Sequence, residues 1–359
     1  MAATFIPAPY REGEVLDLRV CESYSRDLPS RVTATITKVL SMTMSVVLDV
    51  SIQFQTRHGP PIHCVLKLYD RRFGSSLRDV LGNEPAPYTQ ENEAAFQTFV
   101  ARGMMPGFLR HLDERNETAQ FAVAAWKFLE EPDRTERLAK YEAALWYDCI
   151  EHFECETQAY RRLADLQGKL VPRMLAHVSL SPTKLATTIP QEAASYFNIE
   201  GILLERIDGY CLSDLTGFPP PSNLKEWQQI IQSAADAAHE INKYGIIMKD
   251  CAPRNVVVDR RSNTPRIVDL AQCRFQDELE KRWNKQGWHE DEGWDPDVEY
   301  WEQVGAACNP AAIGAVMVMR IQKKTGVKLD IKYPDYESII AGTRRRKAEA
   351  AASGTKSPR

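Results

Sequence analysis

Three oxygen-bearing side chains have types and spacing that suit magnesium-dependent chemistry. Asp250 and Asn255 lie five residues apart on a loop, and an apolar strand pattern begins at Val256. Asp269 directly follows the next strand pattern, which ends at Val268. Two adjacent strands can bring all three side chains to one end of a sheet, where their oxygens could bind Mg²⁺. An Asp that is not a metal ligand could instead orient a hydroxyl nucleophile.

Lys67 is a second candidate, because it interrupts the apolar run from Cys64 to Tyr69. A lysine at such a position either extends its ammonium from a strand edge into water or lies in a cleft with an anionic partner. The sequence around Lys67 leaves both interpretations open.

Glu156 is a third candidate, on a helix predicted over residues 134–166. It follows Phe153 by three residues and precedes Tyr160 by four, which places it on the face that should be buried. A buried carboxylate needs a cation, and Lys67 could supply it. A lysine held by a helix glutamate can place its ammonium on the α and β phosphates of a nucleotide. The alternative is a surface ion pair at the edge of the helix.

These residues occur in the order and spacing of protein kinase motifs. The matching segments are Val65-Leu66-Lys67 for VAIK, Met248-Lys249-Asp250 through Asn255 for HRDLxxxN, and Asp269-Leu270-Ala271 for DFG. Over residues 31–330 the chain resembles the protein kinase-like superfamily, and specifically the fungal protein kinase-like domain proteins. The resemblance implies an α+β, bilobal fold with a small β-rich N-lobe and a reduced helical C-lobe.

The resemblance also implies an activity with ATP and Mg²⁺ as cofactors. The chain would move the γ-phosphoryl group of ATP to a hydroxyl of a protein or small-molecule acceptor. Lys67 would bind the α and β phosphates, Glu156 would anchor Lys67, and Asp250 would be the catalytic base. Asn255 and Asp269 would hold Mg²⁺.

The strand pattern over 199–207 resembles the hinge between kinase lobes. The resemblance implies that backbone groups of Glu205 and Ile207 hydrogen-bond adenine. This assignment rests on register alone, and the alternative is an ordinary strand that ends in a turn.

Segment 38–45 contains no glycine, although kinases have a glycine-rich phosphate flap at this point. A backbone that carries side chains cannot approach phosphates as closely. The hydroxyls of Ser41, Thr43 and Ser45 could donate hydrogen bonds instead.

The neighbours of the catalytic groups also differ from the kinase pattern. His and Arg are replaced by Met248 and Lys249, and Phe and Gly by Leu270 and Ala271. Arg254 could supply the positive charge that neutralises the transferred phosphoryl group. These differences leave a second function open, that of a pseudokinase: a nucleotide-binding or scaffolding module without turnover.

Hydrophobic periodicity predicts the elements that position these residues. Helices are expected over 134–166 and 222–243, and strands over 31–54, 62–69, 173–180, 199–207, 256–258 and 266–268. The polar segment 71–133 is broken by Gly and Pro and holds short helical patterns at 91–101 and 117–129, so we expect an insertion.

The predicted elements suggest a domain organisation. We expect an N-terminal extension over 1–30, an N-lobe over 31–207, a C-lobe over 208–343 and a disordered basic tail over 344–359. Four tryptophans between 283 and 301 flank an acidic run. They either pack in a core beside a solvated acidic loop or line an acidic, aromatic pocket for a cationic substrate.

The composition restricts the remaining function classes. The 359 residues carry 45 Lys and Arg against 49 Asp and Glu, and a net charge of −4 argues against a nucleic-acid partner. No apolar run approaches the roughly 18–20 residues that span a bilayer, and the opening lacks a secretory pattern. We therefore expect an intracellular, cytoplasmic protein without a membrane partner, and Arg344–Lys347 could direct nuclear import.

Overall fold

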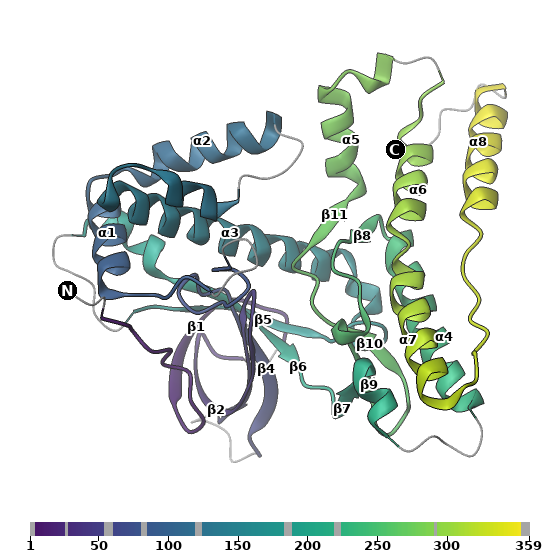
Figure 1. The fold of residues 1–359 in the computed structure, drawn as a ribbon, viewed down its shortest axis with the longest axis horizontal. Coiled ribbons are helices and arrows are strands. Elements are labelled where there is room, and N and C mark those ends of the chain that lie inside the picture. Colours follow the sequence, from purple (N-terminus) through teal and green to yellow (C-terminus); the bar gives the residue numbers. More distant parts are fainter. Residues whose placement is uncertain are drawn as a thin grey trace. The chain divides into compact units, whose positions relative to one another are not determined.

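The computed structural model describes an α+β chain, drawn in Figure 1. The described residues are 4–25, 28–53, 60–79, 85–118, 124–182, 189–218, 224–290 and 293–352. The chain forms two compact units. The first unit comprises Met1–Thr157 and Arg173–Arg206, and the second comprises Gln158–Pro172 and Ile207–Arg359.

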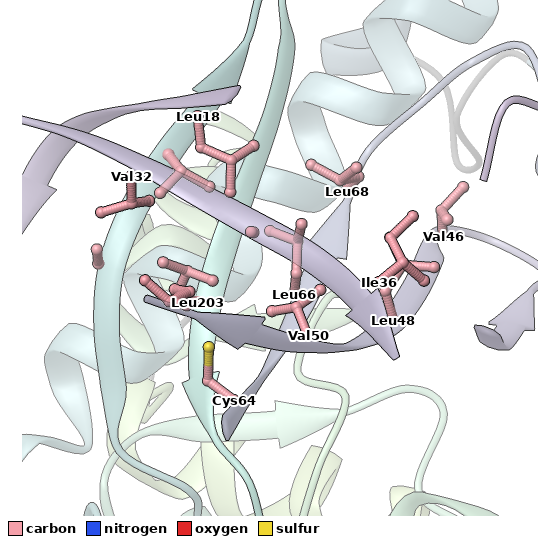
Figure 2. Packing of buried hydrophobic residues seen from close by; sticks show 14 of the residues in the cluster. Leu18, Val32, Ile36, Val46, Leu48, Val50, Cys64, Leu66, Leu68 and Leu203 are labelled. Carbon is pink, nitrogen blue, oxygen red and sulfur yellow. The ribbon is translucent and has the colours of Figure 1, made fainter. Parts of the chain in front are cut away.

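The first unit is built on a closed antiparallel barrel with strand order β1-β2-β3-β4-β6-β5. The strands are β1 (Val15–Ser23), β2 (Arg31–Met42), β3 (Val46–Ile52), β4 (Ile62–Leu68), β5 (Met174–Leu180) and β6 (Ile199–Glu205). Because successive side chains on a strand point to opposite faces, alternate residues fill the barrel. Figure 2 shows this apolar interior, with Leu18, Leu48, Leu66 and Leu203 among its members.

Strand β1 corrects the expectation that residues 1–30 are an extension. It pairs with β2 on one side and with β5 on the other, so it closes the barrel. Leu18 at its centre is fully buried, and Leu16 and Val20 on the same face pack against the same core. The alternation of these three residues is the signal that the sequence interpretation missed.

The expected insertion contains helices α1 (Gln90–Ala101) and α2 (Met105–Thr118), followed by the 3₁₀ helix η1 (Ala125–Glu130). The helical pattern expected over 117–129 differs from the described residues: α2 begins twelve residues earlier and ends at Thr118, and the later part is the 3₁₀ helix η1. Residues 119–123 of the expected range lie outside the described residues. Pro106 and Gly107 suggested a break, but a proline is tolerated in the first turn of a helix, where its missing N–H has no intrahelical partner.

Helix α3 (Arg134–Arg162) is tied to the loop after β4 by a buried cluster of charges. Glu142 is fully buried and forms ion pairs with Arg71 and with Arg78, whose Nη2 lies 2.7 Å from Glu142 Oε1. The amide of Asn92 on α1 donates to the same oxygen at 3.0 Å. Removing one partner of such a buried pair typically lowers the free energy of unfolding by about 3–5 kcal/mol. These ion pairs therefore hold the insertion against α3.

Another carboxylate on α3 has a different electrostatic environment. Burial, reinforced by the like charge of Glu151, raises the pKa of Asp148 to about 7. The native carboxyl therefore keeps its proton at pH values where the unfolded chain, with a value near 3.8, has lost it. The free energy of unfolding should accordingly fall as the pH rises from about 4 to about 7.

Substituting Asp148→Asn should remove this pH dependence, because the amide is neutral throughout. We expect the variant to match the wild type near pH 4 and to exceed its free energy of unfolding by roughly 4 kcal/mol at pH 8. Urea unfolding at the two pH values measures the difference. Glu154→Gln, on an exposed position of the same helix, is the control. Parallel pH profiles for wild type and Asp148→Asn would contradict the prediction.

The second unit is mainly helical and carries two small sheets. Its helices are α4 (Lys225–Lys243), α5 (Gln276–Lys285), α6 (Pro296–Ala307), α7 (Asn309–Thr325) and α8 (Tyr336–Ala352). One sheet has the order β10-β9-β7 and the other the order β11-β8. These strands are β7 (Gly209–Cys211), β8 (Ile246–Met248), β9 (Val256–Asp259), β10 (Pro265–Ile267) and β11 (Cys273–Phe275).

Helix α8 corrects the expected disordered tail over 344–359, at least as far as Ala352. Arg344 pairs with Glu302 at 2.7 Å, and Lys347 pairs with Asp297 at 2.6 Å. These basic residues therefore contact acidic groups on α6. Residues 353–359 lie outside the described residues.

The tryptophan-rich stretch forms part of the core of the second unit. Trp283 stacks on Trp288 and meets Trp294 edge to face, with ring centroids 6.0 Å apart in each case. Leu279, Tyr300 and Val304 belong to the same apolar cluster. Core packing thus accounts for these rings, while Asp291 and Glu292 of the acidic run lie outside the described residues.

The stretch Pro296–Thr325 has the length and composition of a membrane-spanning helix, which differs from the expectation that no run approaches that length. It consists of two helices, α6 and α7, separated by Cys308 in the left-handed conformation with φ 49°. Each has a buried face in the second unit, with Val304 and Ile313 fully covered. Packing of these two faces accounts for part of the apolar composition, since 44% of the apolar window is buried.

Candidate functional site

Lys67 and Glu156 form a buried ion pair in the first unit. Lys67 Nζ lies 2.5 Å from Glu156 Oε2, and the residues are 5% and 0% exposed. Leu66 and Leu68 point into the barrel, so strand periodicity turns Lys67 to the outer face. The burial rules out both alternatives that the sequence left open, a lysine extended into water and a surface ion pair.

Tyr69 completes this group and was missed by the sequence interpretation. Its hydroxyl donates to Glu156 Oε2, and the Lys67 ammonium lies 5.7 Å from the centre of its ring. Phe153, one turn before Glu156, packs edge to face on the same ring. The signal was the i, i+2 spacing of Lys67 and Tyr69, which places both side chains on one face of the strand.

The turn between β2 and β3 is covered by the loop that follows β4. Ser75 donates its amide to Met42 O at 3.0 Å, and Ser76 donates to Thr43 O at 3.2 Å. A Cβ at Gly74 would lie 2.6 Å from Thr43 O, so only glycine permits this approach.

This arrangement bears on the hydroxyls proposed for phosphate binding. Ser45 is only 4% exposed, and its burial argues against a contact with phosphate. Ser41 is half-buried and Thr43 is exposed, and their role as phosphate donors stays a prediction.

The residues expected at the hinge fall in different units, Glu205 in the first and Ile207 in the second. The amide of Glu205 donates to Arg173 O at 2.8 Å, and its carboxylate accepts from the Arg173 amide at 3.0 Å. The amide of Glu205 is thus already engaged within the first unit. Binding of adenine by this segment stays a prediction.

In the second unit, the loop between β8 and β9 brings Asp250, Arg254 and Asn255 together. Asn255 Nδ2 donates to Asp250 Oδ2 at 3.0 Å and to the Asp250 carbonyl at 2.8 Å. Arg254 Nη2 donates to Asp250 Oδ1. Both oxygens of the Asp250 carboxylate therefore have a donor.

Asp269 is joined to this loop through the backbone, because Val268 N donates to Asn255 O at 2.8 Å. Asp269 has φ 68°, a conformation that costs a residue with a side chain roughly 1–2 kcal/mol. Strain of this kind concentrates at functional positions. Because Asn255 donates its amide nitrogen to Asp250, its Oδ1 is a candidate ligand, and the oxygens of Asn255 and Asp269 are of the type that Mg²⁺ prefers. Binding of Mg²⁺ by these two residues stays a prediction.

Asn309 at the start of α7 fixes the strand that precedes Asp250. It is 2% exposed, its Oδ1 accepts from Met248 N at 3.1 Å, and its Nδ2 donates to Met248 O at 2.7 Å. A further bond from Asn242 on α4, at 2.9 Å, holds the Asn309 side chain in place. The sequence carried no periodic signal for Asn309, because its role depends on tertiary packing.

Arg254 pairs with a carboxylate in the structure, and its contact with the transferred phosphoryl group stays a prediction. The sequence interpretation assigned it to the transferred phosphoryl group, whereas its guanidinium pairs with Asp250 in the structure. Its side chain is 63% exposed, so little packing restrains it in this position.

Comparisons with known proteins give a limited result. No protein family and no curated protein matches the sequence. Among solved structures, the chain is similar to the Mycobacterium tuberculosis PknI kinase domain at 12% sequence identity and a TM-score of 0.29. The match covers 66% of this chain and 59% of that chain, and a TM-score of this size does not by itself show a shared fold.

The geometry around Glu156 predicts two different losses of stability. Glu156→Gln removes the negative charge that Glu156 places beside the buried Lys67 ammonium, which should lower the free energy of unfolding by about 3–5 kcal/mol. Tyr69→Phe removes one hydrogen bond and keeps the ion pair, and should cost about 1–2 kcal/mol. Urea unfolding measures both.

Glu154→Gln serves as the control, because Glu154 is exposed on the same helix. It should change the free energy of unfolding by no more than about 0.5 kcal/mol. Equal, small effects of Glu156→Gln and Glu154→Gln would show that the buried pair does not form in solution.

Proposed function

We propose that this chain has a protein kinase-like fold and is an ATP- and Mg²⁺-dependent phosphotransferase that acts on a hydroxyl group. The observation that supports it most is the buried Lys67–Glu156 pair with the Tyr69 hydroxyl. Buried ion pairs contribute little net stability compared with apolar residues of similar size. An ammonium held in this way is therefore better explained by binding to an anion such as a nucleotide phosphate.

The groups of the first unit, together with Ile207 of the second, bind the nucleotide in this proposal. Lys67 donates to the α and β phosphates, while Glu156 and Tyr69 fix the position of its ammonium. Ser41 and Thr43 contribute hydroxyl donors from the β2–β3 turn, and the backbone of Glu205 and Ile207 receives adenine.

The groups of the second unit bind the metal and the acceptor. Asn255 and Asp269 hold Mg²⁺, which would neutralise developing charge on the phosphates. Asp250 orients the acceptor hydroxyl and takes its proton. For this step Arg254 releases Asp250 Oδ1, and its exposed guanidinium is then available to the transferred phosphoryl group.

A specific observation favours a second candidate, a nucleotide-binding module without turnover. Both Asp250 oxygens are engaged by neighbouring side chains, and the loop after β4 covers the β2–β3 turn. If Arg254 stays on Asp250 when nucleotide binds, no base is available for the acceptor.

Substituting Asp250→Asn tests the proposal. The purified protein is incubated with Mg²⁺ and γ-labelled ATP, alone and with cell extract, and the label on protein and small-molecule acceptors is counted. Loss of the base should reduce transfer by about 100-fold or more. Asp214→Asn removes an exposed carboxylate from the same unit and should transfer at the wild-type rate.

Nucleotide binding is measured in parallel by thermal unfolding, since a ligand of the native state raises stability. Absence of any Asp250-dependent transfer would reject phosphotransfer. Mg²⁺-dependent stabilisation by ATP without transfer would establish the second candidate.

A further inference from the structure

A pocket of about 390 Å³ lies in the second unit beside the loop that carries Asp250. Lys249 and Cys251 both line it, so Asp250 stands between two lining residues in the chain. The volume falls within the range of about 300–1,000 Å³ that is usual for small-molecule sites. None of the roles proposed above uses this pocket.

Two cations give the pocket its charge. Lys249 directly follows β8, and its amide donates to Gln272 O at 2.8 Å. Arg274 lies on β11 and pairs with Ile247 of β8. Both side chains are exposed, and neither forms an ion pair with another described residue. Of the ten described residues that line the pocket, none is acidic.

The remaining polar groups add no negative charge. Burial raises the pKa of the Cys251 thiol to about 12, so the thiol stays protonated. Gln303 Nε2 donates to Glu299, while its Oε1 is buried and has no hydrogen-bond partner among the described residues. A buried carbonyl oxygen of this kind favours a ligand that brings a hydroxyl donor.

We propose that this pocket binds the phosphoryl acceptor and that the acceptor is a small alcohol carrying a phosphate group. The inference rests on the proposed function. Lys249 and Arg274 together match the charge of about −1.5 to −2 on a phosphate at neutral pH. Gln303 Oε1 accepts from a second hydroxyl that does not react, and the side chains of Ala306, Ala307 and Ala312 leave room for the carbon chain.

The transfer step balances with groups already named. The acceptor hydroxyl oxygen forms a bond to the γ-phosphorus as the bond between that phosphorus and its bridging oxygen breaks. The electron pair leaves with ADP. The hydroxyl proton passes to Asp250, which is not a lining residue, so the reacting end of the acceptor extends out of the pocket toward this loop. Lys249 and Arg274 act on the acceptor's own phosphate and take no part in bond breaking.

This pocket is positively charged. The site considered from the sequence was instead an acidic, aromatic pocket for a cationic substrate. The tryptophans expected at that site pack against one another in the core. A cationic alcohol would meet two positive side chains in the pocket and no acidic one.

Isothermal titration with inorganic phosphate tests the pocket without requiring turnover. The double variant Lys249→Ala and Arg274→Ala should bind phosphate at least about tenfold more weakly than the wild type. The double variant Arg261→Ala and Lys328→Ala makes the same charge change at exposed positions outside the pocket and should bind as the wild type does. Equal affinities for all three proteins would overturn the proposal.

A second measurement tests the class of acceptor. Glycerol 3-phosphate, glycerol and choline are compared as acceptors of label from ATP in the presence of Mg²⁺. We expect transfer to glycerol 3-phosphate, with a KM that rises in the Lys249→Ala and Arg274→Ala variant. Preference for choline or for glycerol would overturn the assignment of a phosphate-bearing acceptor.

The two experiments separate this inference from the proposed function. If phosphate binding depends on Lys249 and Arg274 but Asp250-dependent transfer is absent from every assay, the phosphotransferase proposal fails and the pocket is an anion site with another role. The acceptor proposal is then overturned with it.

Discussion

A carboxyl group that is removed from water must pair with a cation or keep its proton, and this constraint shapes the first unit. Glu156 on α3 is fully buried, so α3 has to lie where the Lys67 ammonium on β4 can reach it. Glu142, fourteen residues earlier on the same helix, imposes the same requirement on Arg71 and Arg78. The two carboxylates are about 21 Å apart along the helix axis, so they fix both its position and its direction.

The insertion thereby acquires a structural role. The loop after β4 provides the cations for Glu142, covers the β2–β3 turn and leads into α1, whose Asn92 also binds Glu142. The segment is polar and interrupted by Gly and Pro, but its buried residues Arg71, Arg78 and Asn92 bind α3 through Glu142. The Arg254–Asp250 pair in the second unit is easily rearranged, because an exposed pair of this kind is worth at most about 1 kcal/mol.

The sequence was sufficient to predict the residues whose positions follow from the periodicity of a single strand or helix, or from spacing along one loop. Strand alternation and helical spacing led to Lys67 and Glu156, and the spacing of Asp250 and Asn255 led to a loop whose side chains do contact each other. Tyr69 and Asn309 were missed because their roles depend on which elements pack together, and periodicity does not report that. The start of α2 was missed because proline and glycine were interpreted as breakers, although the first turn of a helix tolerates them.

The central claim is that Glu156 acts on the nucleotide through Lys67, and a double-mutant cycle on MgATP affinity tests it most directly. Affinity is measured for wild type, Lys67→Met, Glu156→Gln and the double variant, each confirmed to be folded. The account predicts that each single change weakens binding about tenfold or more and that the double variant binds no more weakly than Lys67→Met. Losses that add in the double variant, or an affinity that none of the changes alters, would contradict it.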